Sequence, residues 1–359
     1  MLNPAALTWS ALNILTKQRY DAIREVFGDL ENALKHVNEE FLRGLGCRQE
    51  TITNTLLRLE EFDADAYAKD VQKRGIKFVT IDDPDYPAQL KEIGDPPVFL
   101  YYKGDLSLLE QPCIALVGTR EMSPLGKQIT DHMVSEFVSA GMVTVSGLAQ
   151  GIDAEVARET IAAGRKTVAV LGHGLRMIFP TSNAKLAEKI LETGGLILSE
   201  FALDIQPDKY TFPSRNRIIA GLSLGTVVLE APVKSGSIIT AELALEYNRD
   251  VFAVPGHALD PQYGGCNELI AKGHAKLVTT AREVLMELGI VASEKKSSAY
   301  APQNDHEEKL LNILTSMPQP IDDLLEKTKL DPGTLSSTLT MMELAGAAKN
   351  VGGGKWVRA

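Results

Sequence analysis

Residues 113–118 read CIALVG, an almost unbroken apolar run that ends in glycine. Similar runs recur along the chain: MVTVSG (142–147), TVAVLG (167–172), GLILSE (195–200), TVVLEA (226–231) and DVFAVP (250–255). Stretches with helical periodicity separate them. Buried parallel strands typically read as near-continuous Val, Ile and Leu, and they alternate with helices. The sequence therefore predicts an α/β fold whose centre is an extended, Rossmann-like, doubly wound parallel sheet.

This Rossmann-like domain is predicted to span residues 111–290. Residues 1–70 contain short helical patterns broken by glycines, which indicates a small helical module of the SAM or helix-hairpin kind. Its LRGLG turn (42–46) could contact a DNA backbone; alternatively the module only packs, since it carries more acid than base. Residues 71–110 are rich in proline and are interpreted as a connecting strap.

The C-terminal part is predicted to be a polar linker (291–305) followed by a winged helix (306–359) with a glycine-tipped hairpin. The expected recognition helix, GTLSSTLTMMELAG (333–346), has no lysine or arginine, although helices that read a DNA groove need such donors. We therefore expect a protein-contact or packing role. Three residues of the wing leave weak DNA contact open: Lys349, Lys355 and Arg358.

The 359 residues carry a formal net charge of −10, which argues against coating of nucleic acid by bulk electrostatics. Any contact with phosphates must come from a local patch. Cys47, Cys113 and Cys266 are far apart and form no CxxC pair, so free thiols are expected. The chain shows no basic leader and no run of about 18 apolar residues, and a cytoplasmic location is expected.

Ligands of an open parallel sheet bind beyond the carboxyl ends of its strands, where loops and helix starts present free N–H groups. The loop GTREMSPLG (118–126) follows the first apolar run. It has neither GxGxxG nor P-loop spacing, so a nicotinamide enzyme and a P-loop ATPase are poorly supported. The loop offers Gly118 for close approach, the Thr119 hydroxyl, and the Arg120 guanidinium for phosphate oxygens. Arg120 could instead cap a nearby carbonyl.

Two further connections bring small and polar residues to the same edge. Ser146 and Gly147 precede a helix with Asp153 in its first turn, and Asp153 is expected to cap that helix or interact with its dipole. The helix after residues 226–231 starts with Lys234, Ser235 and Gly236. Such a start is either an anion site or a plain N-cap.

Residues 212–223 read FPSRNRIIAGLS and place two arginines around Asn216. Arg215 and Arg217 cannot share a helix face at a spacing of two, so the segment is interpreted as a turn or helix start with irregular backbone at Asn216. One arginine is expected to pair with Glu200 or Glu230, and the other to face a ligand. The residues alone leave open which arginine does which.

The ordered motifs VGTR, SGLAQGID, VAVLGHGL, LSE, FPSRNRIIAGLS, VLEA, SGSIITAELALE, RDVFAVPG and GGCNELI closely resemble those of the DNA-processing protein A (DprA/Smf) family. The resemblance covers about residues 81–284. It implies a non-enzymatic, single-stranded DNA-binding protein that protects incoming DNA and loads RecA onto it during natural transformation. It also implies a homodimer formed through the Rossmann domain, with no catalytic residue, cofactor or metal.

Carried onto this sequence, the resemblance implies a DNA pocket of Gly118, Thr119, Arg120, Ser146, Gly147, Arg215, Asn216, Lys234, Ser235 and Gly236. Arg217 and Arg176 complete the predicted set. Several positions depart from the family pattern. Ala157 stands where a histidine is usual, Arg176 where Asp is frequent, and Thr181 where some members have a basic residue. Phe179-Pro180 replaces Tyr-Pro, and Arg176 could restore the missing positive charge.

The first hypothesis is therefore binding of single-stranded DNA by a local cation patch. Four candidate cations predict a slope of about −3 for log affinity against log salt: Arg120, Arg215, Arg217 and Lys234. Phe179 and Phe212 are candidates for base stacking, although both precede proline and could belong to the core.

Two alternatives remain open. The first is a nucleotide-processing enzyme in which Glu200 or Glu230 acts as general acid or base. Each glutamate could equally serve as the ion-pair partner of an arginine. The second is a structural partner protein with an unused pocket.

Overall fold

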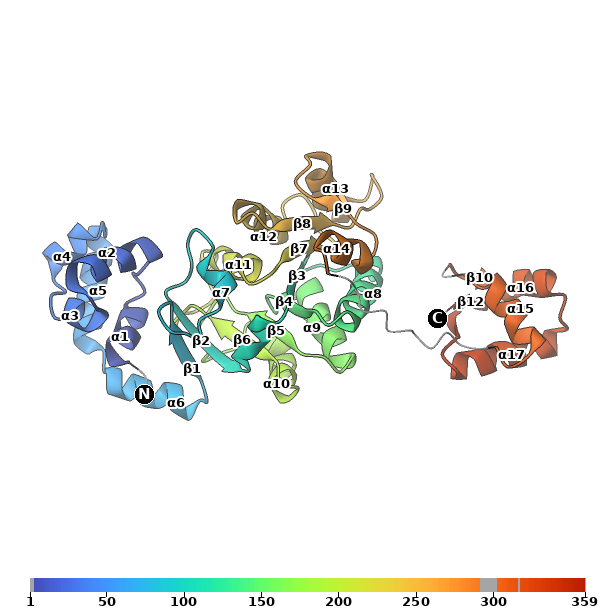
Figure 1. Ribbon diagram of the computed structural model, residues 1–359, viewed down its shortest axis with the longest axis horizontal. Coiled ribbons are helices and arrows are strands. Elements are labelled where there is room, and N and C mark those ends of the chain that lie inside the picture. Colours follow the sequence, from blue (N-terminus) through green and yellow to red (C-terminus); the bar gives the residue numbers. More distant parts are fainter. Residues whose placement is uncertain (1–2, 291–301, 316, 359) are drawn as a thin grey trace. The chain divides into compact units, whose positions relative to one another are not determined.

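The computed structural model describes residues 3–290, 302–315 and 317–358 (Figure 1). The chain forms two compact units, Met1–Ser293 and Glu294–Ala359, and each is described by itself. The first has a helical N-terminus and a large, mostly parallel sheet, and the second is a winged helix. The predicted fold class is confirmed. Most of the predicted linker 291–305 lies outside the described residues.

A nine-stranded sheet forms the centre of the first unit. Six of its strands coincide with the six apolar runs: β3 (Cys113–Val117), β4 (Val143–Ser146), β5 (Thr167–Val170), β6 (Leu196–Ser199), β7 (Gly225–Val228) and β8 (Asp250–Ala253). They are parallel and lie in the order β6-β5-β4-β3-β7-β8. The chain moves outward from β3 to β6 and then crosses back to β7, on the other side of β3. This reversal is the topological switch point at which open α/β sheets bind ligands.

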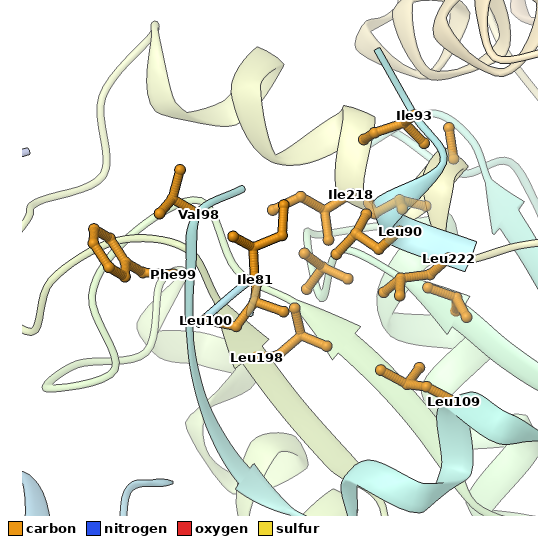
Figure 2. Close-up of a cluster of buried hydrophobic side chains, with 14 of the residues drawn as sticks. Ile81, Leu90, Ile93, Val98, Phe99, Leu100, Leu109, Leu198, Ile218 and Leu222 are labelled. Atoms are coloured by element: carbon orange, nitrogen blue, oxygen red, sulfur yellow. The ribbon is translucent and has the colours of Figure 1, made fainter. Parts of the chain in front are cut away.

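Helices cover both faces of the sheet because successive strand residues point to opposite sides. In β3, Ile114 and Leu116 belong to one core, whereas Ala115 and Val117 belong to another. The first face is covered by α8 (Pro124–Ser139), α9 (Ile152–Ala162), α10 (Ala184–Glu192) and α14 (Ala281–Glu287). The second is covered by α7 (Ala88–Lys91), α11 (Thr211–Gly221), α12 (Gly236–Glu246) and α13 (Gly264–Ala271). Figure 2 shows part of this second core, where Leu90 and Ile218 lie near one another.

The proline-rich segment 71–110 does more than connect, because it extends the sheet. β1 (Lys77–Thr80) and β2 (Phe99–Gly104) pair antiparallel, and β2 pairs antiparallel with β6. The 3-10 helix η1 (Leu106–Glu110) then leads into β3, and the short strand β9 (Lys276–Leu277) forms the opposite edge of the sheet. Two other 3-10 helices lie in connections, η2 (Thr181–Asn183) and η3 (Pro261–Tyr263).

The N-terminal helices are α1 (Pro4–Leu12), α2 (Lys17–Phe27), α3 (Leu30–Leu34), α4 (Glu39–Gly44), α5 (Gln49–Glu61) and α6 (Ala64–Lys73). Trp9 is fully buried among them, and its Nε1–H donates to the Leu30 carbonyl at 3.0 Å. The Arg19 guanidinium donates to the carbonyls of Leu45 (3.0 Å) and Gly46 (3.2 Å) in the LRGLG turn. These carbonyls are therefore satisfied from within the module.

The second unit contains α15 (Asp305–Ile313), α16 (Ile321–Thr328) and α17 (Pro332–Leu344), with the strands β10 (Gln319–Pro320), β11 (Ala348–Gly352) and β12 (Lys355–Arg358). Leu310, Leu324, Leu335 and Trp356 form its core. Asp331 caps α17 by accepting the N–H of the residues two and three positions further on. Among the described residues, no helix is both long and apolar enough to cross a membrane.

Candidate functional site

The switch point between β3 and β7 opens onto a cavity of about 690 Å³. Its walls come from the loop after β3, from α11 and from the start of α12. The predicted residues that line it are Gly118, Thr119, Arg120, Arg215, Asn216, Lys234, Ser235 and Gly236. Arg120 and Ser235 thus open onto one cavity, as a shared anion site requires.

The loop after β3 is held in one shape by the end of β7. Thr119 N–H donates to the Glu230 carbonyl at 2.7 Å, and Ser123 N–H donates to the Glu230 carboxylate at 3.0 Å. Arg120, by contrast, is exposed, and its guanidinium carbon lies 5.1 Å from the centre of the Phe212 ring. Within the described ranges, Arg120 has no ion-pair partner. The loop therefore presents a free cation from a fixed backbone.

Arg215 lies in the cavity wall as a buried cation. Its Nη1 donates to the carbonyls of Gly147 (2.6 Å) and Val170 (2.8 Å), and its Nε donates to Asn216 Oδ1 (2.9 Å). Asp153 Oδ2 lies 3.7 Å from Nη2 and accepts the Gly147 N–H at 3.1 Å. Burial raises the pKa of the Asp153 carboxyl, and the charge of Arg215 opposes that rise. Asp153 forms no cap bond with α9, so its main contacts are with Arg215 and with the loop before the helix.

Arg217 points away from this cavity. Its guanidinium pairs with the Glu200 carboxylate and donates to the Asp95 carbonyl at 2.6 Å. Of the two arginines, Arg217 is therefore the one that pairs with a glutamate. The predicted irregular backbone is wrong: α11 begins at Thr211 and runs regularly through both Arg215 and Arg217. Residues two positions apart on a helix are rotated by about 200° around its axis, so the two side chains point to opposite sides.

The N-terminus of α12 forms another wall. Ser235 is its N-cap and accepts the Ser237 N–H at 3.3 Å, while Asn216 Nδ2 donates to the Gly236 carbonyl at 3.2 Å. A Cβ at Gly236 would meet no atom within 4 Å, so the backbone is open here. The neighbouring Lys234 is exposed and has no ion-pair partner in the described part of the chain. An open helix start beside a lysine suits a phosphate group.

Sequence reasoning missed one cation of this cavity. Lys209 lines it from the connection before α11, and its Nζ lies 4.9 Å from the centre of the exposed Tyr210 ring. Its only signal in the sequence was its place three residues before the FPSRNR motif. Glu121 also lines the cavity and adds one negative group.

A smaller pocket of about 100 Å³ adjoins the large cavity, and both are lined by Arg120, Arg215 and Phe212. Phe179 also lines it, 43% exposed, with its ring centre 6.1 Å from that of Phe212. Neither aromatic ring is buried in the core. Both can therefore present a face to a planar ligand, and their stacking role stays a prediction.

His173 lies in the wall of the smaller pocket and is only 1% exposed. Its Nδ1 is 3.0 Å from the Gly174 carbonyl, and its Nε2 accepts the Phe179 N–H at 3.2 Å. The neutral tautomer with hydrogen on Nδ1 satisfies both contacts. Burial lowers the pKa of the His173 ring, so the folded chain resists its protonation.

We expect acid to destabilise the first unit through His173. Histidine in the unfolded chain takes up a proton near pH ~6.5, whereas folded His173 does so only at lower pH. Unfolding therefore binds a proton in this range, and the free energy of unfolding falls as pH falls. Urea unfolding of His173→Gln between about pH 7 and pH 5 should show a shallower pH dependence. Equal slopes for His173→Gln and the unmodified chain would refute the assignment.

Ser146 and Gly147 lie deeper than the sequence suggested. Ser146 is buried at the end of β4 and lines neither cavity. Gly147 lines the smaller pocket, and a Cβ there would collide with the Arg215 guanidinium. Neither residue therefore lines the large cavity, and the absence of a side chain at Gly147 leaves room for the Arg215 guanidinium.

Arg176 lines neither cavity. Its guanidinium pairs with Asp204 and with Asp70 at 2.5 Å, and it ties the loop after β5 to α6. Ala157, one of the departures from the family pattern, lies on the buried face of α9, and Thr181 is exposed.

The two glutamates of the enzyme alternative line neither cavity. Glu200 is paired with Arg217, and Glu230 is fully buried behind the loop after β3. A general acid or base must reach its substrate. The geometry gives that alternative no support.

Comparison with protein families finds two matches. Residues 77–289 match DNA recombination-mediator protein A, and residues 294–354 match the DprA winged helix domain. The DNA processing protein DprA of Streptococcus pneumoniae is 42% identical over 258 residues, which cover 70% of this chain and 89% of that protein. Protein Smf of Synechocystis is 32% identical, and the match covers 98% of both chains.

Two solved structures show the same likeness. The crystal structure of DprA from Streptococcus pneumoniae has a TM-score of 0.68 at 37% identity and covers 80% of this chain and 98% of that one. The structure of DNA processing protein A from Helicobacter pylori, described for its single-stranded DNA binding mode, has a TM-score of 0.53 at 34% identity. It covers 59% of this chain and 95% of that one.

Proposed function

Because the chain belongs to the DprA/Smf family of DNA-processing proteins, we propose that it binds single-stranded DNA without strong sequence preference in the large cavity. One observation carries the proposal. Arg120, Lys209 and Lys234, three exposed cations from separate connections, meet at one cavity of a chain with net charge −10. A local positive site on an acidic protein binds phosphate chains without attracting nucleic acid to its whole surface.

The proposed contacts divide by chemistry. The three cations and the open N–H groups at the start of α12 bind phosphate oxygens, which are the same for every nucleotide. Phe179 and Phe212 offer ring faces to bases, and every base has a face to stack. Neither type of contact reads base edges. Binding that tolerates any sequence follows from this division.

Salt dependence tests the proposal. Of the four cations expected from the sequence, Arg217 is engaged outside the cavity, and most donors of Arg215 are already occupied. Lys209 joins Arg120 and Lys234 in the cavity, so three exposed cations are available to phosphates. At about 0.7 counterions each, they predict a slope near −2 for log affinity against log salt on a short single strand that fills only the large cavity, shallower than four cations would give. Fluorescence anisotropy with single-stranded and duplex oligonucleotides of unrelated sequence measures it. A slope near zero, or tighter binding of the duplex, would contradict the proposal.

The remaining steps are proposed on the family resemblance. We propose that the chain acts as a homodimer through its first unit, protects incoming single strands in the cytoplasm and loads RecA onto them during natural transformation. The winged helix is proposed to contact protein, because α17 has no lysine or arginine and exposes Met341 and Leu344. Light scattering over a range of concentrations tests the dimer, and RecA nucleation on a protected strand tests the loading.

A further inference from the structure

A second basic groove lies between α9 and α10, two helices that Figure 1 shows next to each other. It has a volume of about 470 Å³ and contains Arg158, Lys185 and Lys189. Lys185 and Lys189 are exposed one helical turn apart on α10, and neither has an ion-pair partner among the residues that the structure describes. None of the three belonged to the predicted site.

Two acids of α9 near this groove, Glu155 and Glu159, lie close to cations other than the α10 lysines. Arg158 pairs with Glu155 at 2.7 Å, and Glu155 also pairs with Lys127. Glu159 lines the groove, but its carboxylate lies 3.9 Å from Lys127 on α8. Glu188 and Glu192 share α10 with the two lysines, but among the described residues no carboxylate lies within 4 Å of either ammonium group, so both ammonium groups are available to a ligand.

The residues that line the groove follow closely along the chain on those that line the smaller pocket. Phe179 and Pro180 line that pocket, and Asn183, three residues further on, lines the groove. The Asn183 side chain donates to the carbonyls of Leu148 (3.0 Å) and Ala149 (3.1 Å), and Ala149 lines both the large cavity and the smaller pocket. We call these hydrogen-bonded residues, Leu148, Ala149 and Asn183, the rim. The large cavity, the smaller pocket and the groove, together the three hollows, follow one another along it in this order.

We propose that the groove is a second contact region for the same single strand, in which Lys185 and Lys189 hold phosphates of the nucleotides that leave the smaller pocket over the rim. This inference rests on the proposed function of the large cavity. Side chains at positions i and i+4 of a helix stand about 5–6 Å apart, so the two ammonium groups can serve adjacent phosphates of an extended strand. The contact is sequence-independent, as in the large cavity.

The test compares oligothymidines of two lengths on the Lys185→Ala/Lys189→Ala double variant of the full chain. An oligomer of about 5 nucleotides fills only the first hollows, whereas one of about 20 also reaches the groove. The variant should bind the long oligomer roughly 5- to 10-fold more weakly at low salt, with a salt slope shallower by about 1.4. Its affinity for the short oligomer should equal that of the unmodified chain.

Lys69→Ala/Lys73→Ala is the matched control, because it removes two exposed lysines one turn apart on α6 that line none of the three hollows. It should bind both oligomers normally. Unchanged binding of the long oligomer by the α10 variant would overturn the inference, and so would equal losses for both lengths or an equal loss in the control. Failure of the unmodified chain to bind the short oligomer would instead overturn the proposed function of the large cavity.

Discussion

Arg120→Ala should keep the fold and weaken binding to single-stranded DNA of any sequence by about 10- to 100-fold. The side chain is exposed and free of acidic partners among the described residues, so apart from its contact with the Phe212 ring its loss removes contacts with the ligand. A hydrogen bond to a charged group is worth about 1.5–3 kcal/mol, which corresponds to this range. The truncation also removes the cation that lies over the Phe212 ring.

Two variants accompany this measurement. Arg120→Lys keeps the charge but loses the planar fork, and it should fall between the unmodified chain and the alanine variant. Arg282→Ala removes an exposed arginine of α14 that lines neither cavity of the site, and it should bind normally. Unchanged affinity of a folded Arg120→Ala protein in gel-shift and anisotropy assays would rule out the proposed placement of the strand.

The six central strands could be predicted because strands buried on both faces have few positions for polar residues. β3 and β5 are buried at every position, and their sequences are almost wholly apolar. The role of residues 71–110 could not be predicted in the same way. β1 is mostly exposed or half-buried, and β2 pairs with β6, which lies far along the chain. Local pattern carries no information about so distant a partner.

The position of the site could be predicted because parallel strands all end at one edge of the sheet. Glycines and hydroxyls that follow those strands must therefore meet, and Gly118, Ser235 and Gly236 do. Which arginine faces the cavity could not be predicted. That choice depends on α11 starting at Thr211, and a shift by two residues would exchange the environments of Arg215 and Arg217.

Asp153→Ala should lower the free energy of unfolding of the first unit by about 3 kcal/mol. Asp153 and Arg215 are both more than nine-tenths buried, so truncation leaves a cation in the interior without a counter-charge. The Gly147 N–H also loses its acceptor. Trp9 lies in the first unit and Trp356 in the second. In a Trp356→Phe background, the fluorescence of Trp9 during urea unfolding therefore reports on the first unit alone.

Two substitutions separate charge from general truncation at this position. Asp153→Asn restores an acceptor for the Gly147 N–H but no charge, so its loss of stability should be smaller than that of Asp153→Ala and still measurable. Asp131→Ala removes a half-exposed carboxylate paired with Lys127, and its effect should stay within about 0.5 kcal/mol. If Asp153→Ala cost no more than this control, the carbonyls of Gly147 and Val170 alone would suffice to hold Arg215. Arg215 would then be fixed by the strand ends themselves, and the carboxylate would matter only to the loop.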